Sequence, residues 1–320
     1  MYSSSNQKNH THTRKNKMSD KKPSSLTDYF LTKKPSSSGS RPPPPSGFGQ
    51  SIRPSLHDRH APEIARLTNL VNYLQQRRSS STKTQGGGSA SGVYVATLAD
   101  TPFHFSWVLL CRQFRVPTEQ EFGSVWACHP QELGKIVLFD GRECTTPRYT
   151  RSYGASYQYS GQVQEAHAPS ECEKVVELLE NINALARDGM QDPSMKYQMC
   201  LVNWYEQHHH INPHSDNTRP LVPQSPIFSL SWGQTRTFRL TPATRQSTTT
   251  KKKQNNKPLD IDLESGDLLV MGGHCQTTHK HEIRKIPPKN RESSTHPPTS
   301  ETARINFTFR SVRSSKGQKN

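Results

Sequence analysis

A histidine and an aspartate two positions apart, His214 and Asp216, end a stretch, residues 199–216, that begins as a strand and continues as a polar loop. Side chains two residues apart on an extended segment point the same way. An imidazole nitrogen beside a carboxylate oxygen supplies two of the three ligands of the facial triad that binds non-haem Fe(II) and leaves positions open for oxygen and a co-substrate. The pair alone is weak, because a histidine-rich chain contains such pairs by chance. A third ligand is therefore required.

Two histidines qualify as the third ligand. His279 and His281 both follow a predicted strand over residues 267–271. If that strand continues, both side chains fall on the same face. Spacing alone therefore does not choose between them.

The C-terminal stretch Arg304-Ile-Asn-Phe-Thr-Phe-Arg310 alternates polar and apolar residues and predicts a strand. Arg304, Asn306, Thr308 and Arg310 fall on one face, opposite the apolar residues. Two arginines on an inner face are costly unless they are paired. They suit a dicarboxylate held by fork-shaped, charge-assisted hydrogen bonds. A basic, exposed edge strand is the alternative.

Composition limits how much of the chain folds and what it binds. Only 30% of the 320 residues are hydrophobic and the mean hydropathy is −0.88, so we expect part of the chain to be disordered. The net charge of +16 and pI near 9.7 indicate a polyanionic partner, with nucleic acid ahead of an anionic membrane. A basic tail alone would supply part of this charge. No apolar run reaches about eighteen residues, so no transmembrane helix is expected.

The chain divides into five predicted segments: a disordered basic arm over 1–61, a short helix over 62–78, a flexible linker over 79–92, a folded domain over 93–313, and a tail over 314–320. In the domain, short runs of β-branched and aromatic residues with turn signals predict a mostly β sandwich or jelly roll. One helix interrupts them. It is predicted to be capped by Ser170 with Glu173, to end at Gly189, and to bury Val175, Val176, Leu178, Leu179, Ile182, Leu185 and Ala186.

The basic arm contains one apolar cluster, Leu26, Tyr29 and Phe30, within residues 24–34. Spacings of three and four place all three on one face of a helical turn, which suits a partner's pocket. The cluster resembles the PIP-box peptide that docks on the DNA sliding clamp PCNA, although Pro23 stands where that motif has glutamine. A chance hydrophobic patch is the alternative.

Five motifs occur together in the order found in one enzyme family: Asn203-Trp-Tyr205, His214-Ser-Asp216, the segment 225–233, the segment 266–271 followed by His281, and Arg304-x-Asn-x-Thr-x-Arg310. In this the chain resembles the AlkB family of Fe(II)/2-oxoglutarate dioxygenases, over about residues 139–313. The resemblance implies a double-stranded β-helix (jelly roll) with a flanking helix and a nucleotide-recognition lid. It also implies Fe(II), 2-oxoglutarate and O2.

The resemblance assigns roles to individual residues. It makes His214, Asp216 and His281 the iron ligands, and prefers His281 to His279 because the family's ligand opens a basic segment, seen here at 282–285. The residues that it implies for 2-oxoglutarate are Asn203, Tyr205, Arg304, Asn306 and Arg310, with Arg304 on the distal carboxylate.

The same resemblance places nucleic-acid contacts upstream of the iron ligands. Arg148, Tyr157 and Tyr159 fall in the lid, where Tyr159 would stack on a flipped base, and Phe139 falls where relatives insert a wedge into the duplex. Ordinary strand tyrosines and a core phenylalanine are the alternatives. The run 208–210, three histidines, reads as a polar loop beside the site or as a metal cluster.

The implied activity is oxidative dealkylation of N-alkylated bases in DNA, such as 1-methyladenine and 3-methylcytosine. It implies a nuclear enzyme, which we expect to be a monomer with no membrane partner. One departure bears on the substrate, because Asn217 and Thr218 occupy positions where relatives carry acidic residues that read the damaged base. Demethylation or hydroxylation of RNA or another modified base, and a catalytically silent nucleic-acid-binding adaptor, are the alternatives.

Overall fold

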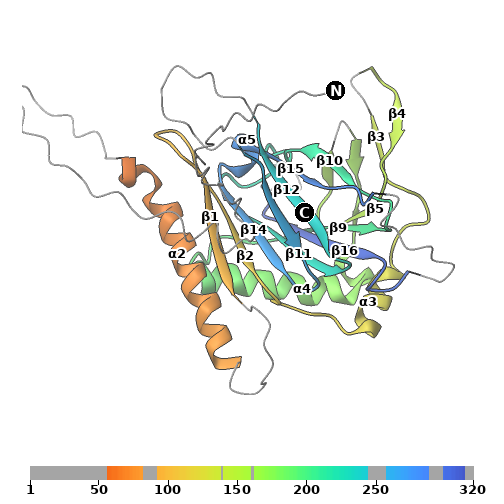
Figure 1. The fold of residues 1–320 in the computed structure, drawn as a ribbon, viewed down its shortest axis with the longest axis horizontal. Helices are drawn as coiled ribbons and strands as arrows, with labels where there is room; N and C mark the ends of the chain where they lie inside the picture. Colours follow the sequence, from red (N-terminus) through yellow and green to blue (C-terminus); the bar gives the residue numbers. More distant parts are fainter. Residues whose placement is uncertain are drawn as a thin grey trace, which may run out of the picture. The chain divides into compact units, whose positions relative to one another are not determined.

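The computed structural model describes residues 56–81, 92–137, 140–159, 162–243, 257–287 and 298–313. Their main feature is an eight-stranded sheet with the order β1-β2-β14-β11-β16-β9-β5-β8 (Figure 1). All its pairings are antiparallel except β5 with β8. In that order the strands are Val93–Asp100, Phe105–Cys111, Leu268–Gly273, Ile227–Gly233, Arg304–Arg310, Met199–Tyr205, Tyr149–Tyr153 and Ala166–His167.

A second, antiparallel sheet has four strands in the order β10-β15-β12-β13, which are Ile211–His214, His279–Ile283, Arg236–Pro242 and Leu259–Leu263. Two small hairpins complete the β structure: β3 with β4 (Lys135–Val137 and Glu143–Thr145) and β6 with β7 (Tyr157–Tyr159 and Gln162–Gln164). Strands β2, β9, β11 and β16 are buried along their whole length. The mostly β, jelly-roll prediction is confirmed.

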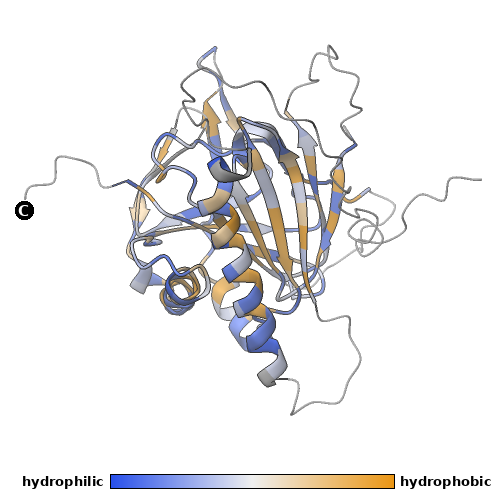
Figure 2. Cartoon of the chain, turned by 90° about the vertical axis from the view of Figure 1, so that its left-hand side faces the viewer, coloured by the Kyte–Doolittle hydropathy of each residue, from blue (hydrophilic) through white to orange (hydrophobic). Residues whose placement is uncertain are grey.

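The main core forms where helices pack on the large sheet. Leu67, Leu70 and Leu74 of α2 (Leu56–Ser81) join one apolar cluster with α4 (Glu173–Ala184) and with Ile305, Phe307 and Phe309 of β16. Figure 2 shows hydrophobic residues gathered along the strands, whereas much of α2 away from the sheet is hydrophilic. Alternation along β16 thus commits its apolar face to the core and leaves its polar face for the opposite side.

Helix α2 differs from the prediction in length and role. It runs from Leu56 to Ser81 and contains Pro62 in its interior, whereas the sequence placed Pro62 in its first turn and ended the helix at residue 78. The six residues before Pro62 are therefore helical, and the predicted boundary of the arm at residue 61 is wrong. A proline inside a helix loses one backbone hydrogen bond. Burial of the leucine stripe offsets that loss.

Helix α4 also departs from its predicted limits. A 3-10 turn, Pro169–Glu171, precedes it, so the N-cap is Cys172 and not Ser170, and one π-helical turn, Leu185–Gly189, follows it. The predicted stripe is buried except for Val176, which is 36% exposed. Val176 lies about 100° around the helix from Val175, which takes it off the buried stripe.

The sequence did not predict helix α3 (Glu119–Trp126) or the single turn α5 (Cys275–Thr278). A reciprocal capping box starts α3, in which Thr118 and Glu121 exchange side-chain to backbone hydrogen bonds. Among the described helices, none is long and apolar enough to cross a membrane.

A buried carboxylate joins α2 to the large sheet. Glu63 is 6% exposed, and its Oε1 accepts hydrogen bonds from Trp107 Nε1 and from the backbone N–H of Gly273, both at 2.9 Å. Its Oε2 faces Arg66 at 3.3 Å. One side chain therefore ties the helix to β2 and to the end of β14, next to the turn α5.

We predict that Glu63→Ala lowers the free energy of unfolding by about 2–4 kcal/mol, because it leaves a buried indole N–H and a partly buried backbone N–H without an acceptor. Urea denaturation of the folded domain measures this loss. Glu63→Gln keeps a carbonyl acceptor at the same place and should lose less. Glu180→Ala, on the exposed side of α4, is the matched control, and an equal loss in both alanine variants would contradict the prediction.

Candidate iron and 2-oxoglutarate site

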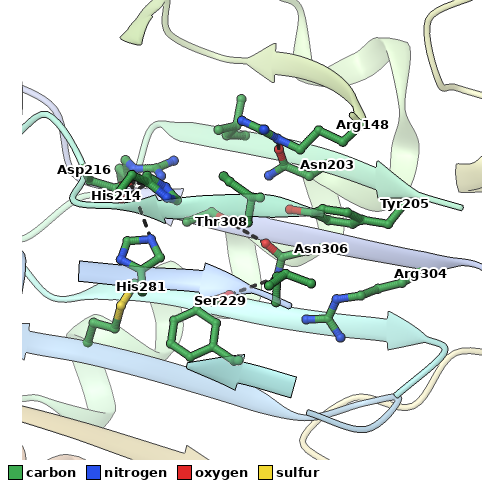
Figure 3. Close-up of a pocket in the computed structure, with 16 residues that line it drawn as sticks. Arg148, Asn203, Tyr205, His214, Asp216, Ser229, His281, Arg304, Asn306 and Thr308 are labelled. Carbon is green, nitrogen blue, oxygen red and sulfur yellow. Dashed lines mark hydrogen bonds and ion pairs between the residues drawn. The ribbon is translucent and has the colours of Figure 1, made fainter. Parts of the chain in front are cut away.

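Strands β10 and β15 bring the three candidate metal ligands together. His214 ends β10 and pairs in register with His281 on β15, so their side chains lie directly opposite each other. Asp216 follows two residues after His214. Its Oδ1 is 3.7 Å from His214 Nε2 and 3.9 Å from His281 Nε2. Figure 3 shows the three side chains converging at one end of a pocket.

Neighbouring groups orient the two imidazole rings. His214 Nδ1 lies 2.9 Å from the carbonyl of Asn212, which can only accept, so Nδ1 carries the proton and Nε2 is left with a lone pair. The ring of Phe238 stacks on His281 at 5.4 Å between centroids. This packing fixes the orientation of the second imidazole.

Burial and neighbouring charges together set the protonation states. Burial lowers the pKa of His214, and burial together with the neighbouring His214 lowers the pKa of His281 to about 3. For Asp216, burial acts to raise the pKa, but the Arg310 guanidinium and the two imidazoles outweigh it, so the pKa falls to about 2. At neutral pH the set is therefore two neutral imidazoles and one carboxylate, which is the donor set that suits non-haem Fe(II).

The structure separates the two candidates for the third ligand. His279 Nδ1 contacts the hydroxyl of Thr278 at 2.8 Å, and His279 is not among the residues that line the pocket. His281 lines it and lies within ligand distance of the other two. The preference for His281 agrees with this geometry.

The polar face of β16 forms the other side of the same pocket. The pocket lies between the two sheets, and about 540 Å³ of space, open solvent at its mouth included, is not filled by atoms. The residues that the family resemblance assigned to iron or 2-oxoglutarate all line it: Asn203, Tyr205, His214, Asp216, His281, Arg304, Asn306 and Arg310. The prediction that the polar face of β16 points inward is thus confirmed.

Arg304 lies at the end of the pocket away from the histidines (Figure 3). It is 1% exposed and donates to Ser231 Oγ at 2.7 Å and to the Leu263 carbonyl at 3.4 Å. Its buried Nε has no hydrogen-bond partner among the described residues, and burial lowers its pKa to about 10. A buried guanidinium in such surroundings is costly until an anion reaches it. The residue therefore fits the distal carboxylate of a dicarboxylate.

The other polar residues of the pocket are held by protein contacts. Arg310 donates to Asp216 Oδ2 through Nη2 at 2.7 Å and Nε at 3.1 Å, so it acts on the metal end of the pocket. Asn306 donates through Nδ2 to Ser229 Oγ and to the Leu230 carbonyl, and its Oδ1 accepts from Thr308. Both the amide nitrogen and the amide oxygen of Asn306 are therefore already hydrogen-bonded within the protein. The first role of this side chain is to hold β16 against β11.

Arg148 lies deeper than a lid residue would. It is 5% exposed, lines the pocket, and donates through Nε to Asn203 Oδ1 at 2.9 Å. This bond orients the amide of Asn203. The side chains of Tyr157 and Tyr159, and the whole of Phe139, lie outside the described residues, as do Leu26, Tyr29 and Phe30.

Gln276 on α5 is a site residue that the sequence reasoning missed. Its Oε1 accepts the backbone N–H of Asp216 at 2.9 Å, while its Nε2 contacts Met271 Sδ at 3.5 Å. Ser215 adds a second tie to the same loop, because its Oγ donates to the carbonyl of His279 at 3.0 Å. Sixty positions separate Gln276 from Asp216, and no local signal connects them.

Comparison with known proteins decides the family. A model of the 2OG-Fe(II) oxygenase superfamily matches residues 123–310, more than half of the chain. The chain belongs to this superfamily. Its cofactors are accordingly Fe(II), 2-oxoglutarate and O2, and the set of His214, Asp216 and His281 fits the metal.

Two relatives extend the comparison. The DNA oxidative demethylase ALKBH2 of Mus musculus is 27% identical over 185 residues, which cover 56% of this chain and 67% of that protein. The solved structure of OsALKBH1 aligns at 21% sequence identity with a TM-score of 0.41, covering 64% of this chain and 96% of that chain.

We predict that Gln276→Ala weakens Fe(II) binding by about 10–100-fold, because it removes a contact that positions the loop of Asp216. Anaerobic titration with Fe(II), or with Mn²⁺ as a stable substitute, measures the affinity. Thr277→Ala alters an exposed neighbour on the same turn and serves as the control. Unchanged affinity in the Gln276 variant would show that the loop needs no such support.

Proposed function

We propose that His214, Asp216 and His281 hold Fe(II), and that Arg304 binds the distal carboxylate of 2-oxoglutarate. The observation that carries this is the pocket with two unlike ends: a neutral imidazole pair with a carboxylate at one end, and a buried arginine without an acidic partner among the described residues at the other. A five-carbon diacid that reaches both ends explains why the two features share one pocket.

The remaining polar residues would assist the co-substrate. We assign Asn203, Tyr205, Asn306 and Arg310 to the 2-oxoglutarate site, where Arg310 also holds Asp216 and Arg148 orients Asn203. The bound Fe(II) supplies oxidative chemistry, in which O2 and 2-oxoglutarate become succinate, carbon dioxide and one oxygen atom for the substrate. The protein's part is to fix the ligands, keep water out and position the substrate.

For the substrate we propose N-alkylated bases in DNA. Hydroxylation of the N-methyl group gives an N-hydroxymethyl base, which releases formaldehyde and a proton and restores the unmodified ring nitrogen. Support comes from the similarity to the mouse DNA oxidative demethylase and from the net charge of +16, which favours a polyanion. Phe139, Arg148, Tyr157 and Tyr159 are the proposed base-handling residues. RNA or another modified base is the second candidate, since Asn217 and Thr218 replace acidic residues.

We also propose that the segment with Leu26, Tyr29 and Phe30 binds a DNA sliding clamp of the PCNA type, which would place the enzyme in the nucleus. The support is the spacing of its apolar residues and the lysines at 33 and 34. A monomer is sufficient for both proposed interactions.

Succinate release with Fe(II) and 2-oxoglutarate across methylated and unmethylated DNA and RNA oligonucleotides tests the substrate. We expect stimulation by DNA that contains 1-methyladenine or 3-methylcytosine, and loss of turnover in Asp216→Ala. Arg304→Lys should raise the KM for 2-oxoglutarate by about tenfold or more, because a point charge replaces a fork of donors. Arg187→Lys, at an exposed site, is its control. Stimulation by methylated RNA alone would favour the second candidate, and no stimulation by any nucleic acid would refute both.

Clamp binding is tested separately. Leu26→Ala combined with Tyr29→Ala should abolish binding to the sliding clamp in a pull-down or calorimetric titration, because the apolar plug is lost. Turnover on a short oligonucleotide should stay at the wild-type level, and Thr32→Ala serves as the control in the same segment. Clamp binding that survives the double substitution would contradict the proposal.

A further inference from the structure

Phe103 is the most exposed large apolar side chain among the described residues, at 73%. It lies in the turn that joins β1, which ends at Asp100, to β2, which begins at Phe105. A single exposed apolar residue is ordinary on a protein surface, so exposure alone assigns it no role. Three features of its surroundings distinguish it: the turn is braced, it lies at the candidate iron end of the large sheet, and the basic arm joins the domain beside it.

Hydrogen bonds hold this turn in one shape. The backbone N–H of Thr101 donates to the His104 carbonyl at 2.9 Å, and the backbone N–H of His104 donates to Thr101 Oγ1 at 3.0 Å. From α2, His60 Nε2 donates to the Thr101 carbonyl at 3.0 Å. Pro102 fixes its own φ. Because the turn is preorganised, little conformational entropy is lost when a ligand contacts Phe103.

A short segment connects the turn to the loop of a candidate iron ligand. His104 packs edge-on against His274 at 5.1 Å between ring centroids, and the backbone N–H of His274 donates to the Phe105 carbonyl at 2.9 Å. His274 is the N-cap of α5, and two residues later Gln276 accepts the backbone N–H of Asp216. Figure 1 shows the β1–β2 hairpin and α5 at the same end of the large sheet.

The order of the sheet gives the sideways distance from this turn to the candidate iron site. Arg310, which contacts Asp216, ends β16 at the same end of the sheet as the first residue of β2, and β11 and β14 lie between the two strands. Three strand spacings make about 14 Å, or about four base steps of a nucleic acid strand. The pocket is more open at this end, because the side chain of His214 is 16% exposed and Arg304 is 1% exposed. A strand with one base in the pocket therefore reaches Phe103 within a few nucleotides.

The basic arm brings positive charge to the same place. Helix α2, which contacts the turn through His60, begins at Leu56, and residues 1–55 before it contain ten Lys and Arg residues against two Asp residues. A strongly cationic segment favours a polyanionic partner. The exposed Asp100 opposes an anion beside Phe103, but it is one charge against an excess of eight in the arm.

We propose that Phe103 is a nucleic-acid contact, whose ring stacks on an unpaired base of the substrate strand about four nucleotides from the base in the pocket. The inference rests on the proposed function and adds a second point at which the substrate is held. Stacking on an aromatic ring tolerates any base, because every base has a π face. Phe103 therefore lengthens the stretch of strand that the protein binds without adding a sequence preference.

Fluorescence anisotropy of the full-length protein with single-stranded DNA that carries one central 3-methylcytosine tests the proposal. For a strand with about eight nucleotides on each side of that base, we expect Phe103→Ala to weaken binding about tenfold or more, because one stacked base is lost. Binding of a trinucleotide centred on the same base, measured by competition, should not change, because the trinucleotide does not reach Phe103. Phe103→Trp should keep the wild-type affinity. Val116→Ala, at a 51% exposed residue beyond the opposite end of β2, is the matched control.

Equal affinity of the wild type and Phe103→Ala for the long strand would overturn the proposal and leave the turn for another partner, such as a protein. A loss of the same size on both lengths would also overturn it, because it would indicate a change in the pocket; circular dichroism checks that the variant folds. A wild-type protein that binds no nucleic acid has the same consequence. Succinate release on the trinucleotide should be equal in wild type and Phe103→Ala, and that assay judges the proposed function by itself, so the two proposals can fail separately.

Discussion

The buried ion pair between Arg310 and Asp216 is the contact on which the arrangement of the pocket depends. Arg310 ends β16 in the large sheet, and Asp216 follows β10 in the small sheet, so the pair joins the two sheets. Their side chains are 4% and 3% exposed. A buried pair of this kind adds little net stability, but breaking it costs about 3–5 kcal/mol because one charge is left unpaired. The main effect of the pair is therefore to fix the positions of the two side chains.

The position of Arg310 determines which oxygen of Asp216 faces the two histidines. Arg310 occupies Oδ2 of Asp216, so Oδ1 is the oxygen that faces both histidines. Gln276 holds the backbone of the same residue from the other side. The guanidinium also keeps the pKa of Asp216 near 2 against the opposing effect of burial. A single arginine thus sets the orientation and the charge of this candidate ligand.

Local periodicity explains which parts of this arrangement the sequence could predict. The alternation of β16 was sufficient to assign Arg304 and Arg310 to one face, and the stripe of α4 was correct except at Val176. Long-range contacts were not predictable in this way. Gln276 reaches Asp216 across 60 positions and Arg148 reaches Asn203 across 55, and such pairs depend on how the sheets pack. Helix α3 is different, because its capping box, Thr118 and Glu121, is visible in the sequence.

A second set of two histidines and a carboxylate, Glu206, His208 and His209 in the turn between β9 and β10, shows that ligand types alone do not define an oxygenase site. Asp216 and His281 are 3% and 9% exposed, whereas Glu206 and His208 are 34% and 55% exposed. Only the first set opens onto a pocket that also contains Arg304. Electrostatic interactions are strengthened where water is excluded, and an oxidising site must keep its co-substrate beside the metal. In this chain, burial and the shared pocket distinguish the set around Asp216, which we propose as the iron site, from the exposed turn of Glu206 and His208.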